Sequence, residues 1–351
     1  MSIVTASQTA GLKKPRMRHM DIAKGIGMIC IIAGHLGKPE IDNVVFSFHV
    51  PLFFIISGWF FRSASSTREA AIKYAKHLLV PYIYCMVACV LGTGVMHTLI
   101  SGPEGSWEAM AQSFVSALYG SGSLSSPIWG IPSFGATWFL LALFWALIML
   151  NGIAKQKWTP LVVVGTFLAS IATRDWWLPF SLQSGMCALL FVYIGYIAKD
   201  KLGDGVLRGA TVPHWLAATA VCVWALAYFL DRGEMSIARC YFTCIPVDCI
   251  GAVAGTLVVI WLSSLFEHVP VLSSALELLG RYSLTAMCLH LFELKTVPWE
   301  ELLRFFGFAG DAAYPWRLCL LLIAIKLLWV YLGIGVVEAI NAHNHRQAAA
   351  A

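Results

Sequence analysis

The amino-acid sequence predicts an all-α integral membrane protein with about ten transmembrane helices and with both termini in the cytoplasm. The first observation is composition: of 351 residues, 59% are hydrophobic and 12% are charged, whereas an ordinary soluble domain carries about 25% charged residues. The mean hydropathy of +0.74 agrees with this. The second observation is the spacing of the apolar stretches, and the third is the placement of Lys and Arg between them.

Each predicted helix has close to the length that crosses a bilayer, which is about 20 mostly apolar residues. In chain order we expect helices over residues 22–36, 44–61, 78–100, 136–153, 158–173, 182–198, 214–230, 240–266, 279–297 and 316–340. The first stretch is the shortest, and its helix can begin as early as Arg18. Together they form a single membrane domain, 21–340, between an N-terminal cytoplasmic tail, 1–20, and a C-terminal cytoplasmic tail, 341–351, that we expect to be disordered.

Lys and Arg set the orientation, because they favour cytoplasmic connections. They gather in the N-terminal tail and in alternate connections, namely Lys13, Lys14, Arg16 and Arg18; Arg62, Arg68, Lys73 and Lys76; Lys155 and Lys157; and Lys199, Lys201 and Arg208. Segment 101–135 contains neither residue and is predicted to lie outside. The first twenty residues show no cleavable secretory signal. We therefore expect a multi-pass protein of the plasma or inner membrane.

The predicted outer segment has apolar residues at helical intervals over 108–119, followed by sequence rich in Gly, Ser and Pro as far as Pro132. Trp107, Trp129 and Trp138 lie around it. An interfacial helix with an aromatic belt explains this pattern. A re-entrant lid whose aromatic side chains stack on a ligand ring also explains it, and the sequence does not separate the two.

Ionisable residues within the predicted helices are candidates for a functional site, because burying such groups in a membrane is costly. Lys24 and His35 are eleven residues apart, so they share one helix face and lie about 16 Å apart along its axis. His49 and His290 have a similar predicted depth on two further helices, with Glu293 one turn beyond His290. The three imidazoles can therefore converge.

A cluster of three histidines has two chemical interpretations. One is a metal site, but no helix has a dense ligand spacing such as His-Glu-x-x-His, and we expect no metal. The other is general base catalysis, because an imidazole of near-neutral pKa can accept a proton from a hydroxyl group. His35 is the first candidate for that base. Hydrogen bonding between helices is the structural alternative.

Asp248 and Lys326 are two further charged residues in predicted helices. Opposite charges buried in a membrane generally pair, so we expect them to pair with each other or with Glu293. Asp248 can alternatively orient a histidine, as a carboxylate does in a catalytic triad. Ser57 can carry a covalent intermediate, but the dipeptide Ser57-Gly58 is more typical of close helix packing.

Cysteine usage and net charge exclude two other classes of site. The ten cysteines are scattered singly, mostly in apolar runs and without a Cys-x-x-Cys pair, which indicates core packing rather than disulfides or zinc. The net charge of +5 does not indicate nucleic-acid binding, because the positive charges lie in short connections, where they set topology.

Three motifs resemble the acyltransferase family 3 of membrane enzymes. Lys24 precedes His35 by the interval at which that family places Arg, or Lys in some branches, before its histidine. The second predicted helix continues with Phe-Phe-Ile-Ile-Ser-Gly over 53–58, similar to the family's Phe-Phe-x-x-Ser-Gly, and Lys73-x-x-Lys76 resembles its basic pair. Lys24 and the stretch Gly-Arg-Tyr-Ser-Leu-Thr-Ala-Met-Cys-Leu-His over 280–290 are most similar to the branch named for fucose 4-O-acetylase.

The resemblance implies an acetyl-CoA-dependent O-acetyltransferase. Such an enzyme moves an acetyl or short acyl group from cytoplasmic acyl-CoA to a hydroxyl of a surface glycan, or of its precursor, on or near the outer face. His35 is then the base, and the further catalytic candidates are His290, His49 and Asp248. The phosphates of CoA would meet cations at the cytoplasmic mouth, which are Lys24, Lys73, Lys76 and Arg281.

Two other functions stay open at this point. A proton-coupled secondary transporter also places Asp, Lys and His in its helices, although no inverted repeat is visible in the sequence. Acyl transfer to an acceptor other than a sugar is the second alternative. The expected partners are acyl-CoA, a carbohydrate acceptor and membrane lipid, and a homo-oligomer is compatible with the sequence.

Overall fold

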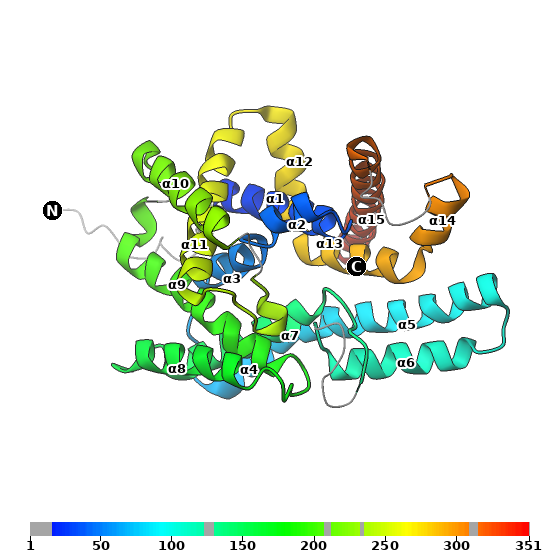
Figure 1. Cartoon of the computed structure of the whole chain (residues 1–351), viewed down its shortest axis with the longest axis horizontal. Coiled ribbons are helices and arrows are strands. Elements are labelled where there is room, and N and C mark those ends of the chain that lie inside the picture. The colour runs from blue at the N-terminus through cyan, green and yellow to red at the C-terminus, as the bar shows by residue number, and fades with distance from the viewer. Residues whose placement is uncertain (1–15, 123–129, 207–211, 232–234, 309–314, 351) are drawn as a thin grey trace.

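The computed structural model describes residues 16–122, 130–206, 212–231, 235–308 and 315–350, and all regular elements in these ranges are helical (Figure 1). In chain order the helices are α1 (Arg18–Gly34), α2 (Pro39–Val45), α3 (His49–Trp59), α4 (Thr67–Tyr74), the π-helical turn η1 (Ala75–Leu79), α5 (Val80–Ser101), α6 (Ser106–Tyr119), α7 (Trp138–Ile153), α8 (Thr159–Ala172), α9 (Leu182–Val206), α10 (His214–Asp231), the 3₁₀ turn η2 (Ile237–Arg239), α11 (Ile245–Phe266), α12 (Pro270–Arg281), α13 (Ser283–Thr296), α14 (Trp299–Phe305) and α15 (Trp316–Ala350).

Five helical stretches in the described part of the chain are long and apolar enough to cross a membrane. They are Pro39–Trp59, Thr67–Ser101, Leu182–Lys201, Ile245–Phe266 and Trp316–Asn344. Shorter apolar helices cover Trp138–Ile153, Thr159–Ala172 and His214–Leu230, where the sequence predicted further spans. The protein is thus an all-helical, multi-pass membrane protein with these candidate spanning helices.

Several helix boundaries differ from the predicted ones: some helices continue through polar residues that a hydropathy window excludes, and others begin later or divide at a turn. The predicted helix 44–61 begins already at Pro39 and is interrupted by a turn at residues 46–48. The predicted helix 240–266 begins only at Ile245, and 279–297 divides at Tyr282 into α12 and α13. The tail 341–350, which we expected to be disordered, continues α15 as a helix.

The helix that was predicted from residue 78 starts at Thr67, as α4, η1 and α5 are continuous. Pro81 explains the π-helical turn between them. Proline has no N–H to donate to the carbonyl four residues earlier, and the chain widens just before it, where the Val80 N–H bonds to Ala75 O. Lys73 and Lys76 therefore lie on a helix instead of in a loop.

The segment after α5 contains the helix expected at 108–119, here α6, which runs alongside α5 (Figure 1). Trp107 is 74% exposed on it. The connection that follows turns back into the molecule, where Ser133 and Gly135 line a large cavity described below. The expected aromatic residue Trp129 lies outside the described residues. Thus α6 itself packs on a neighbouring helix, and only the connection after it reaches the cavity.

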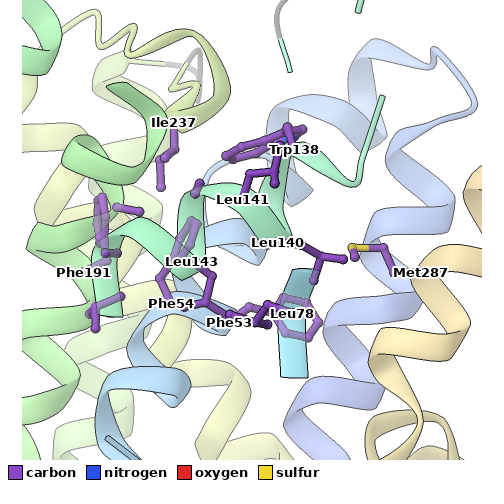
Figure 2. Packing of buried hydrophobic residues seen from close by; sticks show 14 of the residues in the cluster. Phe53, Phe54, Leu78, Trp138, Leu140, Leu141, Leu143, Phe191, Ile237 and Met287 are labelled. Atoms are coloured by element: carbon purple, nitrogen blue, oxygen red, sulfur yellow. The ribbon is translucent and has the colours of Figure 1, made fainter. Parts of the chain in front are cut away.

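Helices α1 and α3 occupy the middle of the molecule (Figure 1). α1 packs against α12 and α11, and α3 packs against α9. Figure 2 shows the main hydrophobic core, in which Phe53 and Phe54 of α3 meet the apolar face of α7 and Phe191 of α9. Phe54 is fully buried, and its ring centroid lies 4.6 Å from that of Phe139. The core thus fixes α3 between α7 and α9.

Glycine allows two of these helix pairs to approach backbone to backbone. A β-carbon at Gly58 would lie 1.9 Å from Val192 O, and one at Gly195 would lie 1.9 Å from Ile55 O, so α3 and α9 meet through a reciprocal glycine contact. A β-carbon at Gly280 would lie 1.7 Å from Asp21 O, which joins α12 to α1 in the same way. The expectation that Ser57-Gly58 serves helix packing is confirmed at Gly58.

The Gly195→Ala substitution is expected to destabilise the protein by about 1–3 kcal/mol, because the new methyl group overlaps a backbone carbonyl that cannot move aside alone. Thermal unfolding of the purified protein in detergent measures the loss. Gly165→Ala on α8 is the matched control, since nothing lies within 4 Å of its β-carbon position. An unchanged unfolding temperature for Gly195→Ala would contradict the close approach of α3 and α9.

Candidate active site

A cavity of about 960 Å³ lies between α1, α3, α7 and α13, and the segments 133–136 and 235–239 also line it. Its walls are mostly apolar and aromatic, with a few polar groups, as is typical of binding sites for small molecules. Polar and ionisable side chains among its lining residues are Lys24, His35, Asp42, Asn43, His49, Ser57, Ser133, Ser236, Arg239 and Ser283. Two of the three predicted histidines therefore face one cavity.

The cavity follows α1 from Lys24 to His35, which are about 16 Å apart along a helix. The segment 235–239 belongs to the His35 end. Met235 shares a separate small pocket with Ser47, which lies in the turn between α2 and α3. The neighbouring Phe46 ring lies 3.4 Å from the β-carbon position of Gly34, so this turn is next to the C-terminus of α1. We refer to the two regions as the Lys24 end and the His35 end of the cavity.

His35 is the residue that ends α1, and its side chain is exposed to the cavity. Its Nδ1 lies 2.7 Å from the carbonyl oxygen of Ile31. A carbonyl oxygen only accepts hydrogen bonds, so Nδ1 carries the proton and Nε2 carries the free electron pair. His35 is thus held in the tautomer that a general base requires, through a bond within its own helix.

His290 of α13 lies beside His35, with the two ring centroids 5.1 Å apart in an edge arrangement. His290 is fully buried, and its Nδ1 lies 3.0 Å from Glu293 Oε2. Its Nε2 is buried, and no group in the described part of the chain forms a hydrogen bond with it. A buried polar nitrogen without a partner is costly. The structure therefore brings together two imidazoles that the sequence separates by most of the chain.

Glu293 is the centre of a buried charge network. Besides His290, it bonds Lys326 of α15 and accepts a hydrogen bond of 2.5 Å from Trp299 Nε1. Lys326 also lies over the Trp299 ring, 4.1 Å from its centroid. Glu293 is 2% and Lys326 3% exposed. The sequence predicted that Lys326 pairs with Asp248 or Glu293, and in the structure it pairs with Glu293. Nothing in the sequence indicated that Trp299 takes part in this network.

His49 begins α3 and is 3% exposed. Its Nδ1 lies 2.5 Å from Val45 O, so its proton is also on Nδ1 and its Nε2 is the free nitrogen. It lines the same cavity as His35.

The described residues include no group of three or more His, Cys, Asp or Glu side chains arranged to hold a metal ion. The arrangement suits proton transfer at the His35 end.

The predicted phosphate-binding cations occupy different places. Lys24 lines the cavity, and its Nζ is 2.8 Å from Asp21 Oδ1 on the same helix. Lys73 and Lys76 are exposed and line a separate open groove of about 480 Å³ on α4 and η1. Arg281 is exposed at the end of α12 and is not among the cavity-lining residues. Of these cations, only Lys24 reaches the central cavity.

Asp248 and Ser57 occupy different places relative to the large cavity. Asp248 is buried in the first turn of α11, where it accepts a hydrogen bond of 3.2 Å from the Cys244 N–H and lines a small separate pocket with Trp224. It is not among the residues that line the large cavity. Ser57 does line it, but its hydroxyl donates to Phe53 O over 2.7 Å. Of the two, Ser57 therefore shares the cavity with the two histidines that line it.

An all-helical protein with several candidate spanning helices and a histidine-lined internal cavity belongs to the class of multi-pass membrane proteins with a chamber for small molecules. Comparison with protein families narrows this class. The family model of acyltransferase 3, described as an acyltransferase domain, matches residues 18–334. The protein therefore belongs to the acyltransferase 3 family and is a membrane acyltransferase, which confirms the family that the motifs suggested. Comparison with curated proteins and with solved structures finds no match.

The Glu293→Gln substitution is expected to destabilise the protein by about 3–5 kcal/mol, because it leaves the buried ammonium of Lys326 without its counter-charge. Thermal unfolding in detergent measures the loss, and adding Lys326→Met to Glu293→Gln should restore most of it. The control is Glu300→Gln in the exposed pair of Glu300 with Arg304, which should change stability by less than about 1 kcal/mol. Equal effects at Glu293 and Glu300 would show that the buried pair is not structural.

Proposed function

We propose that the protein transfers an acetyl or other short acyl group from acyl-CoA to a hydroxyl of a surface glycan or its precursor. The observation that carries the proposal is the single cavity that joins Lys24 to His35. Family membership supports acyl transfer, and the cavity supports the way in which donor and acceptor meet. The similarity of residues 280–290 to the fucose 4-O-acetylase branch supports a sugar hydroxyl as the acceptor.

The Lys24 end suits the donor. CoA is rich in phosphate charges, and Lys24 is the cation that lines this end of the cavity. The long pantetheine arm can lie along the apolar wall formed by Met28 and Ile31 of α1, so that the thioester reaches His35 about 16 Å away. In the proposed orientation this end faces the cytoplasm, because the basic N-terminal tail, Lys73 and Lys76 belong to that side. Arg281 can add a contact outside the cavity mouth.

His35 is the proposed general base. Its Nε2 takes the proton of the acceptor hydroxyl as the hydroxyl oxygen attacks the thioester carbonyl. The C–S bond breaks, the thiolate of CoA leaves, and the proton on His35 passes to that sulfur. Atoms and charges balance in a direct transfer, with one ester formed for one thioester broken. Ser57 is not required, since its hydroxyl is engaged with Phe53 O.

His290 is proposed to share this proton. During the reaction His35 becomes a cation in a largely apolar cavity, where an isolated charge is costly. His290 lies beside it with a free Nε2, and Glu293 bonds the opposite nitrogen of the His290 ring. A carboxylate in that position stabilises an imidazolium. His49 faces the same cavity and is proposed to orient the acceptor hydroxyl.

The His35→Ala substitution is expected to lower acyl transfer by at least about a hundredfold, the usual contribution of a general base. Purified protein in detergent is assayed for acyl-CoA binding and for acyl loss. Binding should persist and acyl loss should not. His268→Ala, at an exposed position outside the cavity, is the control. Substantial turnover by folded His35→Ala protein would remove His35 as the base, and absence of acyl-CoA binding by the folded wild type would end the enzyme proposal.

The Lys24→Ala substitution is expected to weaken acyl-CoA binding by about tenfold, the value of one charge-assisted contact. Lys24→Arg should weaken it less, because the charge is kept. Equilibrium binding of acyl-CoA and of dephospho-CoA to each variant gives the comparison. Equal losses for Ala and Arg would argue against a charge contact at this position.

A further inference from the structure

The His35 end of the cavity holds a cation that acyl transfer does not use. Arg239 is the one arginine among the described lining residues and lies in the segment 235–239. Lys24 Nζ lies 2.8 Å from Asp21 Oδ1, and Asp21 also pairs with Arg16. Among the described residues, no carboxylate forms an ion pair with the Arg239 guanidinium. Within this part of the chain, the cavity therefore has a cation paired with a carboxylate at the Lys24 end and a cation without such a partner at the His35 end.

Arg239 is held on a rigid turn. Ser236 and Tyr241 exchange two backbone hydrogen bonds, of 2.8 and 2.9 Å, which close the turn around it. The next residue, Cys240, is fully buried and has a φ of 49°, a left-handed conformation that is uncommon without glycine. The Arg239 guanidinium carbon lies 5.7 Å from the centroid of the Tyr241 ring. The backbone position of Arg239 is thus fixed before any ligand arrives, and its exposed side chain extends from there over the Tyr241 ring.

A second arginine lies beside the same tyrosine ring, with the Asp175 carboxylate 4.0 Å from its Nε. Arg174 lies at the same distance, 5.7 Å, from the Tyr241 ring, but it does not line the cavity. In the orientation proposed above, both arginines are on the outer side, where the bias of Lys and Arg toward the cytoplasm cannot account for them. An anionic ligand accounts for Arg239.

Hydrogen-bonding groups at the same end fit hydroxyls. Asp42 and Asn43 of α2 line the cavity, together with Ser133 and Ser236. The Asp42 Oδ1 atom is buried and has no hydrogen-bond partner among the described residues, so a ligand hydroxyl can supply the donor that it lacks there. Trp138 and Phe139 add aromatic faces to the wall. Hydroxyl recognition beside a cation describes a sugar that carries an acidic group.

We propose that Arg239 and Asp42 form an acceptor subsite for an acidic sugar, in which Arg239 binds a carboxylate or phosphate group and Asp42 accepts a hydrogen bond from a sugar hydroxyl. This rests on the proposed function for the identity of the acceptor, but the binding itself does not require acyl transfer. A guanidinium can bind either anion through two parallel hydrogen bonds. The subsite selects which sugar presents its hydroxyl to His35.

Ligand binding by the full-length protein in detergent tests the subsite. The probes are methyl β-glucuronide for a carboxylate, glucose 6-phosphate for a phosphate and methyl β-glucoside as the neutral sugar, each followed by the rise in unfolding temperature with concentration. Wild type should bind one of the acidic probes at least about tenfold more tightly than the glucoside. The acidic probe that binds more tightly identifies the anion.

Arg239→Gln should abolish the preference for acidic probes, and Arg239→Lys should keep part of it. Arg174→Gln is the matched control, because it removes the other guanidinium from the same tyrosine ring without touching the cavity, and it should keep the preference. Equal binding of acidic and neutral sugars by wild type, or an unchanged preference in Arg239→Gln, would overturn the subsite.

A parallel assay of acyl-CoA turnover separates the two proposals. An intact preference for acidic sugars without acyl-CoA turnover would remove the proposed transfer and support the subsite. Turnover that occurs equally with the neutral and the acidic sugars, with no difference between wild type and Arg239→Gln, would support the transfer and overturn the subsite.

Discussion

The buried ion pair between Glu293 and Lys326 is the interaction on which the site depends. It joins α13 to α15, and both side chains are almost completely removed from solvent. Desolvating two charges is expensive, and the mutual attraction offsets the cost only when the geometry is good and the remaining hydrogen-bonding capacity is used. Here Glu293 also accepts hydrogen bonds from Trp299 Nε1 and from His290 Nδ1. The pair thereby fixes the rotation of α13, and with it the position of the His290 ring beside His35.

Close backbone contacts set the second constraint, which is the position of each helix along its own axis. α1 carries both Lys24 and His35, and its contact with α12 through Gly280 leaves no room for it to slide. α3 carries His49 and Ser57 and is held against α9 in the same way. Lys24 and His35 lie on one helix, which sets the distance between the two ends of the cavity, and α3, held against α9, keeps its part of the wall in place. Catalysis that depends on positioning gains from such rigidity.

The sequence predicted the parts of this site that follow from helical spacing and left out those that follow from tertiary contacts. Lys24 and His35 do line one cavity, and the expected convergence holds for His35 with His290. Helix ends were misplaced where polar residues continue a helix, as at Thr67. Arg239 could not be found, because it lies in a short turn without periodicity, and only the folded chain shows that the turn lines the cavity.

The separation of Lys24 from Arg239 also has an electrostatic consequence for the reaction as proposed. Two like charges about 4 Å apart repel by about 4 kcal/mol at an effective dielectric constant of 20, and at about 16 Å by about 1 kcal/mol. A donor held by its phosphates at the Lys24 end and an acidic acceptor held at Arg239 would keep their anionic groups far apart. Only the neutral thioester and the neutral hydroxyl then meet at His35. Opposite ends with one cation each therefore allow two anionic molecules to react inside one apolar cavity.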